Sequence, residues 1–515
     1  MMSVPSGPTR MPRAAGGLSL LVVALLAGAL AGCGSGSSSS SSLSEHSFSG
    51  DAYPGVDLAN TRQVKSEIES GSVSQLKEAW SIPIEGQGVY GSYASTPVVA
   101  DGVVYSQDLE SNVQALDLDS GDVLWSTKYE SASHGPNGLA VADGRVYGAT
   151  ASEAFALDQK TGKEAWATPL GGAIDMAPGV NEGKVYVSTV PETPNAEYEA
   201  GAVGTLWAMD GKTGKKLWHF DTVPKGLWAH PEINSGGGLW YPPSFDAKGD
   251  VYIGTGNPAP LPGTPNHPWG SSRPGKNLYA DSMVKLDPKT GKVLWYYQET
   301  PHNIYDWDFQ DSPILTKSMG KEVAIGAGKS GFVVAVDVKT GKVVWRQTVG
   351  VHNGHDKDSL YAMRGEYDKI KTGEVFPGQL GGVIAPMASD GERVYVPIVN
   401  HSMTVRSGSE VSEESSAEGE IEAIDLRTGD IVWETQLPSP AYGALLVAND
   451  VVFATSAEGI VHALNVNSGG EVWQAALPAG TNAGVMVSGD MMLAPAGLPV
   501  AEGQTAKLVA FKLGG

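Results

Sequence analysis

The chain has 515 residues, of which 66 are glycine, 32 are proline and 18% are charged, and this composition predicts many short strands joined by turns. Its formal net charge of −22 argues against nucleic acid as a partner, because phosphate binding needs a basic face. The acidity is typical of a soluble exterior, and attraction to a basic partner protein stays open.

The first 33 residues have the pattern of a processing signal. Arg10 and Arg13 precede an apolar run over residues 18–31 that is too short for a comfortable membrane span. The run ends in Leu30-Ala31-Gly32-Cys33, which resembles the lipobox of bacterial lipoproteins. The resemblance implies export, lipidation of Cys33 and anchoring to the outer face of the cell membrane. An ordinary signal peptide with an incidental cysteine is the alternative.

The Gly/Ser-rich residues 34–60 are predicted to form a flexible tether, and residues 61–515 the folded domain. Cys33 is the only cysteine, so the sequence predicts no intrachain disulfide, no Cys-x-x-Cys-His haem attachment and no thiolate metal site. Any redox chemistry therefore needs a cofactor that is not attached through cysteine, or a separate protein that accepts electrons.

One sequence motif recurs along the domain. In each copy an apolar strand ends at Asp, a Thr-Gly or Ser-Gly turn follows, and the next strand carries Trp. Its copies run from Asp117 to Trp125, Asp158 to Trp166, Asp210 to Trp218, Asp287 to Trp295, Asp337 to Trp345, Asp425 to Trp433, and Asn465 to Trp473. A further hairpin often precedes the motif, so each repeat is predicted to contain four antiparallel strands.

Four-stranded units of this length are typical of β-propeller blades. Trp80 has no Asp-x-x-Thr-Gly before it, whereas residues 506–513 resemble the strand that would precede it. The sequence therefore predicts an all-β, eight-bladed propeller whose ring is closed by strands from both termini. The repeated tryptophans are expected to cover the faces between neighbouring blades.

Spacing between the repeated tryptophans locates insertions. Trp218 and Trp295 are 77 residues apart and Trp345 and Trp433 are 88 apart, against 41 from Trp125 to Trp166. The longest interval includes the acidic stretch from Glu410 to Glu422, which is predicted to be a solvated loop.

The candidate chemistry lies in the stretch from Tyr252 to Pro313. It includes the segments Gly254-Thr255-Gly256-Asn257-Pro258-Ala259-Pro260 and Thr300-Pro301-His302-Asn303-Ile304-Tyr305-Asp306-Trp307-Asp308. Carboxamide and carboxylate oxygens in rigid Gly/Pro-rich turns are typical ligands of hard cations.

Together with the Asp-x-x-Thr-Gly-x-x-x-Trp repeat, these segments resemble the family of pyrroloquinoline quinone (PQQ) dependent alcohol dehydrogenases. The likeness runs from about Trp80 to the C-terminus. It implies that PQQ and either Ca²⁺ or a lanthanide ion are bound, and that an alcohol is oxidised by hydride transfer to the quinone. The electrons would pass to a separate acceptor such as a cytochrome c or a quinone.

The resemblance also assigns roles to single residues. Asp306 would be the catalytic base, and a metal would be held by Glu199, Asn257 and Asp306. Trp240 would form the floor beneath the quinone, and Lys329 would contact the cofactor. Asn400, after the predicted strand over residues 394–399, would touch the cofactor or would be a plain strand-end Asn. Asp308 resembles the additional ligand of the lanthanide-using branch, or it is a solvent-facing acid in a loop.

The chain departs from the family pattern in several places. The paired adjacent cysteines are absent, and Ser133-His134-Gly135-Pro136-Asn137 lies near their position. An expected Arg after Asn137 is missing. His352 and His355 would suit a transition metal, but an isolated pair on a polar loop is more typical of ordinary surface histidines. A non-catalytic binding or scaffold propeller of the cell envelope is therefore the alternative function.

Overall fold

The computed structural model describes residues 46–192 and 198–514, which fold almost entirely as β-strands. Among the described residues, eight sheets each contain four antiparallel strands. The first four consist of β2 (Leu76–Pro83), β36 (Lys507–Leu513), β35 (Met491–Ala496) and β34 (Met486–Ser488); β3 (Val98–Ala100), β4 (Val103–Gln107), β5 (Val113–Asp117) and β6 (Val123–Thr127); β7 (Ala140–Ala142), β8 (Arg145–Ala149), β9 (Glu153–Asp158) and β10 (Glu164–Pro169); and β11 (Gly179–Asn181), β12 (Lys184–Thr189), β13 (Thr205–Asp210) and β14 (Lys216–Asp221).

Two of the other four sheets carry an extra strand. The four consist of β16 (Ser244–Phe245), β17 (Val251–Gly254), β19 (Ser282–Leu286) and β20 (Val293–Gln298); β21 (Ile314–Ser318), β22 (Lys321–Gly326), β23 (Phe332–Asp337) and β24 (Val343–Thr348); β26 (Ala388–Ser389), β27 (Arg393–Ser407), β28 (Glu410–Asp425) and β29 (Ile431–Leu437), with β25 (Gly373–Val375) also on β27; and β30 (Leu446–Ala448), β31 (Val451–Ser456), β32 (Ile460–Asn465) and β33 (Glu471–Ala476), with β1 (Gln63–Val64) parallel to β30.

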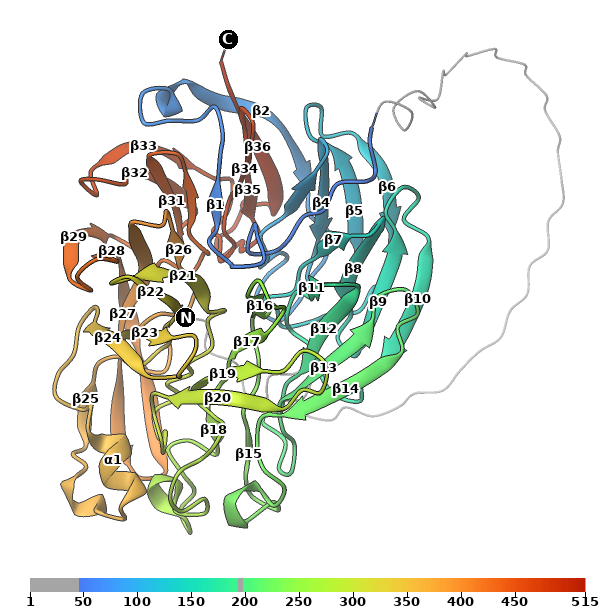
Figure 1. The fold of residues 1–515 in the computed structure, drawn as a ribbon. Coiled ribbons are helices and arrows are strands. Elements are labelled where there is room, and N and C mark those ends of the chain that lie inside the picture. The colour runs from blue at the N-terminus through green and yellow to red at the C-terminus, as the bar shows by residue number, and fades with distance from the viewer. Residues whose placement is uncertain (1–45, 193–197, 515) are drawn as a thin grey trace, which may run out of the picture. The chain divides into compact units, whose positions relative to one another are not determined.

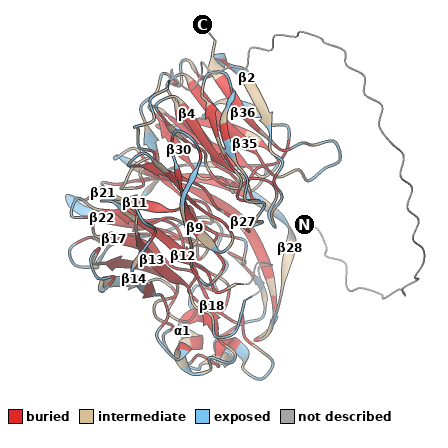
Figure 2. Ribbon diagram, turned by 90° about the vertical axis from the view of Figure 1, so that its right-hand side faces the viewer, coloured by how far each residue is buried: buried red, intermediate tan, exposed pale blue. Residues whose placement is uncertain are grey.

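The sheets stand around a common centre (Figure 1), which is the arrangement of a β-propeller. The strands nearest the centre are buried along most of their length (Figure 2), whereas outer strands such as β10 and β33 alternate between exposed and half-buried residues. Core clusters lie between neighbouring sheets: one joins Val103 and Tyr105 of β4 to Phe155 and Leu157 of β9. Each sheet therefore buries its faces against the next.

The first long strand and the last strand of the propeller, β2 and β36, lie in one sheet. β2 pairs antiparallel with β36, with Trp80 opposite Ala510. Figure 1 shows these two strands side by side, although they lie at opposite ends of the sequence. The predicted pairing of the two ends of the chain is therefore present, and it gives the first strand a partner along its full length.

Seven of the repeated tryptophans pack on the turn glycine of the next sheet. Trp125 packs on Gly162, where an added Cβ would lie 2.4 Å from the indole, and its Nε1 donates to the Gln159 carbonyl over 3.1 Å. Gly162 has a φ of +67°, and the Thr161 hydroxyl donates to Asp158 Oδ1 over 2.7 Å. The turn thus needs glycine both for its backbone conformation and for contact with the indole.

The insertions gather at one end of the propeller, at the bottom of Figures 1 and 2. They include the two-stranded sheet of β15 (Ser235–Gly236) with β18 (Pro258–Ala259), the helix α1 (Asp358–Met363) and β25. Short 3-10 turns are η2 (Val73–Gln75), η3 (Leu227–Ala229), η4 (Pro268–Gly270) and η5 (Tyr367–Lys369). Within the part of the chain that the structure describes, none of the helices has the length and hydropathy of a membrane span.

Two expectations from the sequence are corrected. The acidic stretch from Glu410 to Glu422 belongs to strand β28 rather than to a loop, because the long strand β27 pairs with it from Ser407 to Arg393. The compact unit already begins at His46 rather than at residue 61: Ala52 exchanges backbone hydrogen bonds with Val141, and Asn60 Nδ2 donates to the Ser312 carbonyl over 2.9 Å. Cys33 and residues 34–45 lie outside the described residues.

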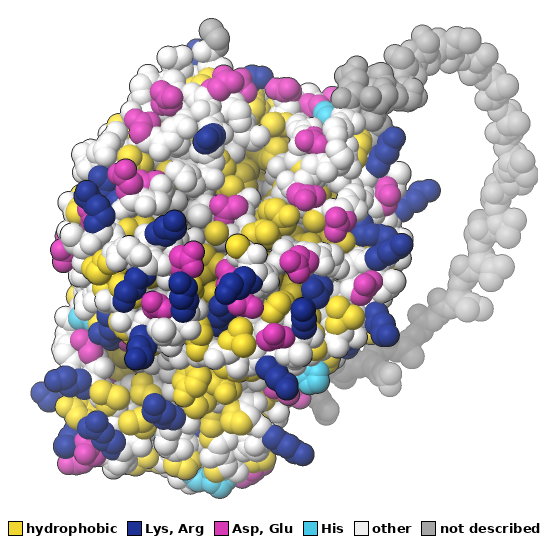
Figure 3. Space-filling view, in the orientation of Figure 1, with side chains coloured by type: hydrophobic (Ala, Val, Ile, Leu, Met, Phe, Trp, Pro, Cys, Tyr) yellow, Lys and Arg dark blue, Asp and Glu magenta, His cyan; other side chains and the backbone are white. Residues whose placement is uncertain are grey.

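Figure 3 shows basic and acidic side chains interspersed over one face of the propeller. The net charge of −22 is therefore not expressed on this face as a single acidic patch. On this face, at least, the acidity is that of a mixed, solvated exterior.

Candidate functional site

The candidate site lies at one end of the sheets. In a four-stranded antiparallel meander, the connection between the second and third strands and the connection leaving the fourth emerge at the same end. Those connections hold Asn257 (β17 to β19), Asp306 and Asp308 (β20 to β21) and Lys329 (β22 to β23). The Asp-Thr-Gly turns join third and fourth strands and thus lie at the opposite end.

These connections surround a cavity of about 520 Å³. Its wall includes residues as distant in sequence as Pro54 and Leu498, as expected of a cavity to which many sheets contribute. Trp240, Asp306, Asp308 and Lys329 all line it, so four of the predicted site residues come together.

Lys329 joins the two aspartates. Its Nζ lies 2.9 Å from Asp306 Oδ2 and 2.6 Å from Asp308 Oδ2, and the Asp308 side chain is 2% exposed. Burial, reinforced by the charge of Asp308, raises the pKa of Asp306 to about 7, although Lys329 pulls it down. Burial opposes the charge of Lys329, but the two carboxylates raise its pKa above the usual value.

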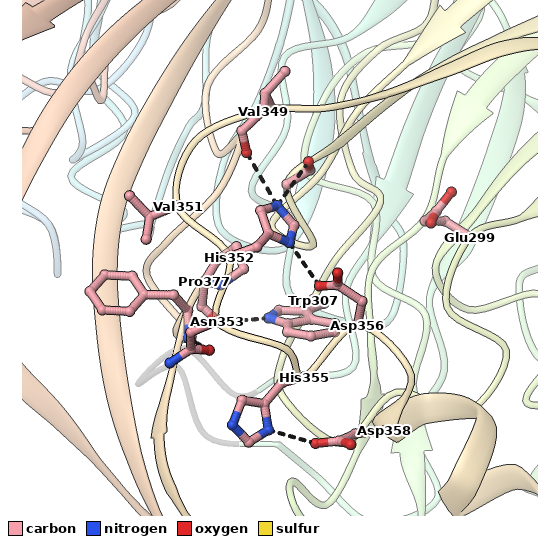
Figure 4. Close-up of polar contacts among 12 residues, drawn as sticks. Glu299, Trp307, Val349, Val351, His352, Asn353, His355, Asp356, Asp358 and Pro377 are labelled. Carbon is pink, nitrogen blue, oxygen red and sulfur yellow. Dashed lines mark hydrogen bonds and ion pairs between the residues drawn. The ribbon is translucent and has the colours of Figure 1, made fainter.

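Asp306 is held in a strained backbone conformation, with a φ of +61°. Its neighbours are both buried and both anchored. The Tyr305 hydroxyl donates to Asp358 Oδ2 over 2.6 Å. Trp307 Nε1 donates to the Pro377 carbonyl over 3.0 Å, as Figure 4 shows. These two contacts hold the residues on either side of Asp306 in place, so the carboxylate of Asp306 is preorganised toward the cavity.

Asn257 is tied to the same cluster. Its backbone N–H donates to Asp308 Oδ1 over 2.6 Å, and its side-chain oxygen accepts from the Tyr198 hydroxyl over 2.7 Å. Trp240 presents its ring to the cavity, and its buried Nε1 has no hydrogen-bond partner among the described residues. The Trp240 ring and the carboxylates of Asp306 and Asp308 therefore face one space, whereas Asn257 contacts Asp308 from behind that lining.

Two predicted site residues lie elsewhere. Glu199 is exposed and does not line the cavity, and residues 193–197 beside it are outside the described part of the chain. Asn400 lies within β27 rather than at a strand end; its oxygen accepts from the Val351 N–H and its nitrogen donates to Glu420. It borders a separate, glutamate-rich pocket.

The sequence reading missed other residues of the cavity. Glu192 lines it, and burial followed by the charges of Asp175 and Asp308 raises the pKa of Glu192 to about 7. His134 also lines it, in the loop where the family's cysteines were expected. Arg62 is buried in the wall, and burial lowers its pKa to about 10. The spacing of the repeats held no signal for these residues, because they lie in connections of unequal length.

His352 and His355 do not form a common metal site. Each binds its own aspartate, with His352 Nδ1 2.7 Å from Asp356 Oδ1 and His355 Nδ1 2.7 Å from Asp358 Oδ2 (Figure 4). Because Asp358 also accepts from Tyr305, His355 supports the segment that carries Asp306.

Comparison with known proteins places this geometry in a family. A family model described as "Glucose/ethanol/alcohol dehydrogenase, beta-propeller domain" matches residues 55–346, which is more than half of the chain. The chain belongs to this family. A second model, described as "Outer membrane protein assembly factor BamB", matches residues 372–515.

Named relatives agree with the first model. The quinohemoprotein alcohol dehydrogenase of Comamonas testosteroni is 35% identical over 322 residues, which are 54% of this chain and 43% of that protein. Quinohemoprotein alcohol dehydrogenase ADH-IIG of Pseudomonas putida is 32% identical over 307 residues, which are 52% of this chain and 41% of that protein. The chain thus spans less than half the length of these relatives.

The fold agrees over a longer stretch. The crystal structure of the Comamonas testosteroni enzyme superposes with a TM-score of 0.76 at 25% identity, and covers 92% of this chain and 82% of the other. The β-propeller architecture therefore extends over nearly the whole of this chain.

Proposed function

We propose that this protein is an exported quinoprotein dehydrogenase that oxidises an alcohol or a related hydroxyl compound, with Asp306 as general base. In this proposal the eight sheets are the eight blades of a closed propeller, and Cys33 anchors the chain to the outer face of the cell membrane. The observation that carries the proposal is the Asp306–Lys329–Asp308 cluster beside Trp240 in one cavity of a chain from this family.

The residues present fit a hard cation. The carboxylates of Asp306 and Asp308 share the single ammonium of Lys329, which leaves the carboxylates of this cluster in excess in a largely buried space. Asp306 and Asp308, with the carboxamide of Asn257, would hold Ca²⁺ or a lanthanide ion through oxygen. The second carboxylate at Asp308 favours the ion of higher charge.

The cavity also fits PQQ. Its volume of about 520 Å³ lies within the usual range for small-molecule sites. Trp240 offers a flat face for an aromatic cofactor, and Lys329 and Arg62 offer positive charge to its oxygens. When bound, PQQ supplies a two-electron oxidant and the cation supplies a Lewis acid.

The chain's own residues would handle the proton. The ionised carboxylate of Asp306 would accept the hydroxyl proton of the alcohol, while Lys329 Nζ holds that carboxylate in place. Tyr305 and Trp307 keep the backbone of Asp306 fixed during this transfer. A separate acceptor, such as a cytochrome c or a quinone, would take the electrons.

A scaffold function is the second candidate, and one observation favours it. The C-terminal part of the chain matches the assembly-factor family rather than the dehydrogenase family. In that case the propeller would bind other proteins of the cell envelope, and the cavity would have no redox role.

The test uses the purified full-length chain with PQQ and either Ca²⁺ or La³⁺, and follows dye reduction over a panel of alcohols. Turnover should need both PQQ and the cation and should disappear in Asp306→Asn. Asp356→Asn is the matched control, because that aspartate binds His352 outside the cavity and should leave turnover intact. If PQQ binds with neither cation, the scaffold function is favoured.

A further inference from the structure

Three side chains of metal-binding types meet at the wall of the cavity. His134 lies in the connection from β6 to β7, Asp175 in that from β10 to β11, and Glu192 follows β12. One ligand atom from each lies within 4.8 Å of the other two. The side chains of His134 and Asp175 are each 2% exposed, with Nδ1 and Oδ2 3.3 Å apart.

The donor set indicates the class of ion. One imidazole nitrogen with two carboxylate oxygens suits Zn²⁺, Mn²⁺ or another divalent first-row transition metal, whereas Ca²⁺ takes oxygen donors alone. His134 and Glu192 also line the cavity, so an ion bound by these three residues would keep a coordination position open toward it. Three protein ligands with one open position are typical of catalytic rather than structural metal sites.

We propose that His134, Asp175 and Glu192 bind a divalent transition-metal ion with an open coordination position facing the cavity. The site is distinct from the proposed hard-cation site, because its ligands come from other connections and include nitrogen. It would present the metal to an oxygen atom of any molecule in the cavity. This inference does not depend on the dehydrogenase reaction.

The alternative is a metal-free cluster in which His134 and Asp175 form only a buried ion pair. A metal-binding measurement distinguishes this alternative from the proposed metal site. Co²⁺ is the probe because its visible absorption depends on its ligands. The purified full-length chain, stripped with a chelator, is titrated with Co²⁺ in excess Ca²⁺, which fills oxygen-only sites. Proton NMR then checks for a hyperfine-shifted imidazole N–H. No PQQ or alcohol is present.

The wild-type chain should bind one Co²⁺ at this site. Because loss of even an outer-shell partner weakens metal sites about 10- to 100-fold, His134→Gln and Glu192→Gln should each weaken binding by at least about 100-fold. His219→Gln removes a histidine from an exposed His–Asp pair and should bind as wild type does, as should Asp306→Asn.

Equal Co²⁺ binding by wild type, His134→Gln and Glu192→Gln would overturn the inference, as would absence of binding by wild type. Glu192→Gln keeps the shape of a partly buried side chain, so it serves if His134→Gln fails to fold. Because the readout is a metal spectrum, failure here is distinguishable from failure of PQQ-dependent turnover.

Discussion

Removal of the charge of Lys329 should show how strongly Asp306 and Asp308 destabilise the fold when no positive charge neutralises them. Lys329→Met keeps the length of the side chain but leaves Asp306 and Asp308 without their shared ammonium. Breaking a buried ion pair by removing one partner costs about 3–5 kcal/mol. We therefore expect the metal-free variant to lose about 3–5 kcal/mol of unfolding free energy at pH 7, measured by urea unfolding followed by tryptophan fluorescence.

Two conditions should restore Lys329→Met. A cation held by the aspartates replaces the missing positive charge, and La³⁺ at 100 times its dissociation constant would return about 2.7 kcal/mol. Acid should also help, because burial and the charge of Asp308 raise the folded-state pKa of Asp306 and Lys329 no longer opposes them in the variant. The destabilising charge of Asp306 is then absent near pH 4, and stability should fall as pH rises through that raised pKa.

The chain provides a matched control in Lys285. Its Nζ lies 3.2 Å from Asp246 Oδ2 and 2.8 Å from Asp250 Oδ2, away from the cavity, and its side chain is 9% exposed. Lys285→Met should lose a similar free energy but gain little from La³⁺, because Asp246 also accepts the Tyr252 hydroxyl. Equal rescue of both variants by La³⁺, or no loss in Lys329→Met, would refute the proposed cation site.

Three further changes test other parts of the molecule. Burial and neighbouring glutamates raise the pKa of Glu422 to about 7, so its stabilising protonated form is lost as pH rises through 7. Glu422→Gln should therefore reduce the fall in unfolding free energy between pH 5 and 8. The variant should be more stable than the wild type by up to about 3 kcal/mol at pH 8, measured by chemical unfolding. Gly162→Ala places a Cβ 2.4 Å from Trp125 at a φ of +67° and should cost about 1–3 kcal/mol by the same assay, whereas an unchanged stability would contradict the role of the turn. Tyr305→Phe removes the hydrogen bond to Asp358 and should lower stability by about 1–2 kcal/mol and slow PQQ-dependent turnover while PQQ binding, followed by fluorescence, stays unchanged.

Periodicity explains how far the sequence predicted this structure. The Trp and Gly positions repeat, so one physical reason, an indole packed on a glycine turn, could be applied at each copy. Asp306, Asp308, Lys329 and Trp240 were selected by the family resemblance, and they line one cavity because each lies in a connection at the same end of its sheet. The strand count fixes that end of each sheet, whereas the choice of these four residues rested on their match to the family's segments.

Predictions failed where the repeat is interrupted. Glu199 was chosen by its distance from a repeat position across an insertion, and in the structure it is exposed while Glu192 faces the cavity. Asn400 was expected at a strand end, but β27 continues to Ser407 because β28 pairs with it beyond that point. Spacing conveys no geometry across an insertion whose own fold is unknown.

The two parts of the chain that match different family models contribute different kinds of residue to the cavity wall. The charged and imidazole side chains of its wall, which include Arg62, Glu192 and Lys329, lie within residues 55–346, the part that matches the dehydrogenase model. The described residues of 372–515 that line the wall are uncharged, among them Ile384 and Tyr442. A ligand with several oxygens would therefore be bound by the first part and covered by the second. Burial of charge is costly, and the cavity gathers Arg62, Glu192, Lys329 and two aspartates around one space, which favours a binding role over an incidental cavity.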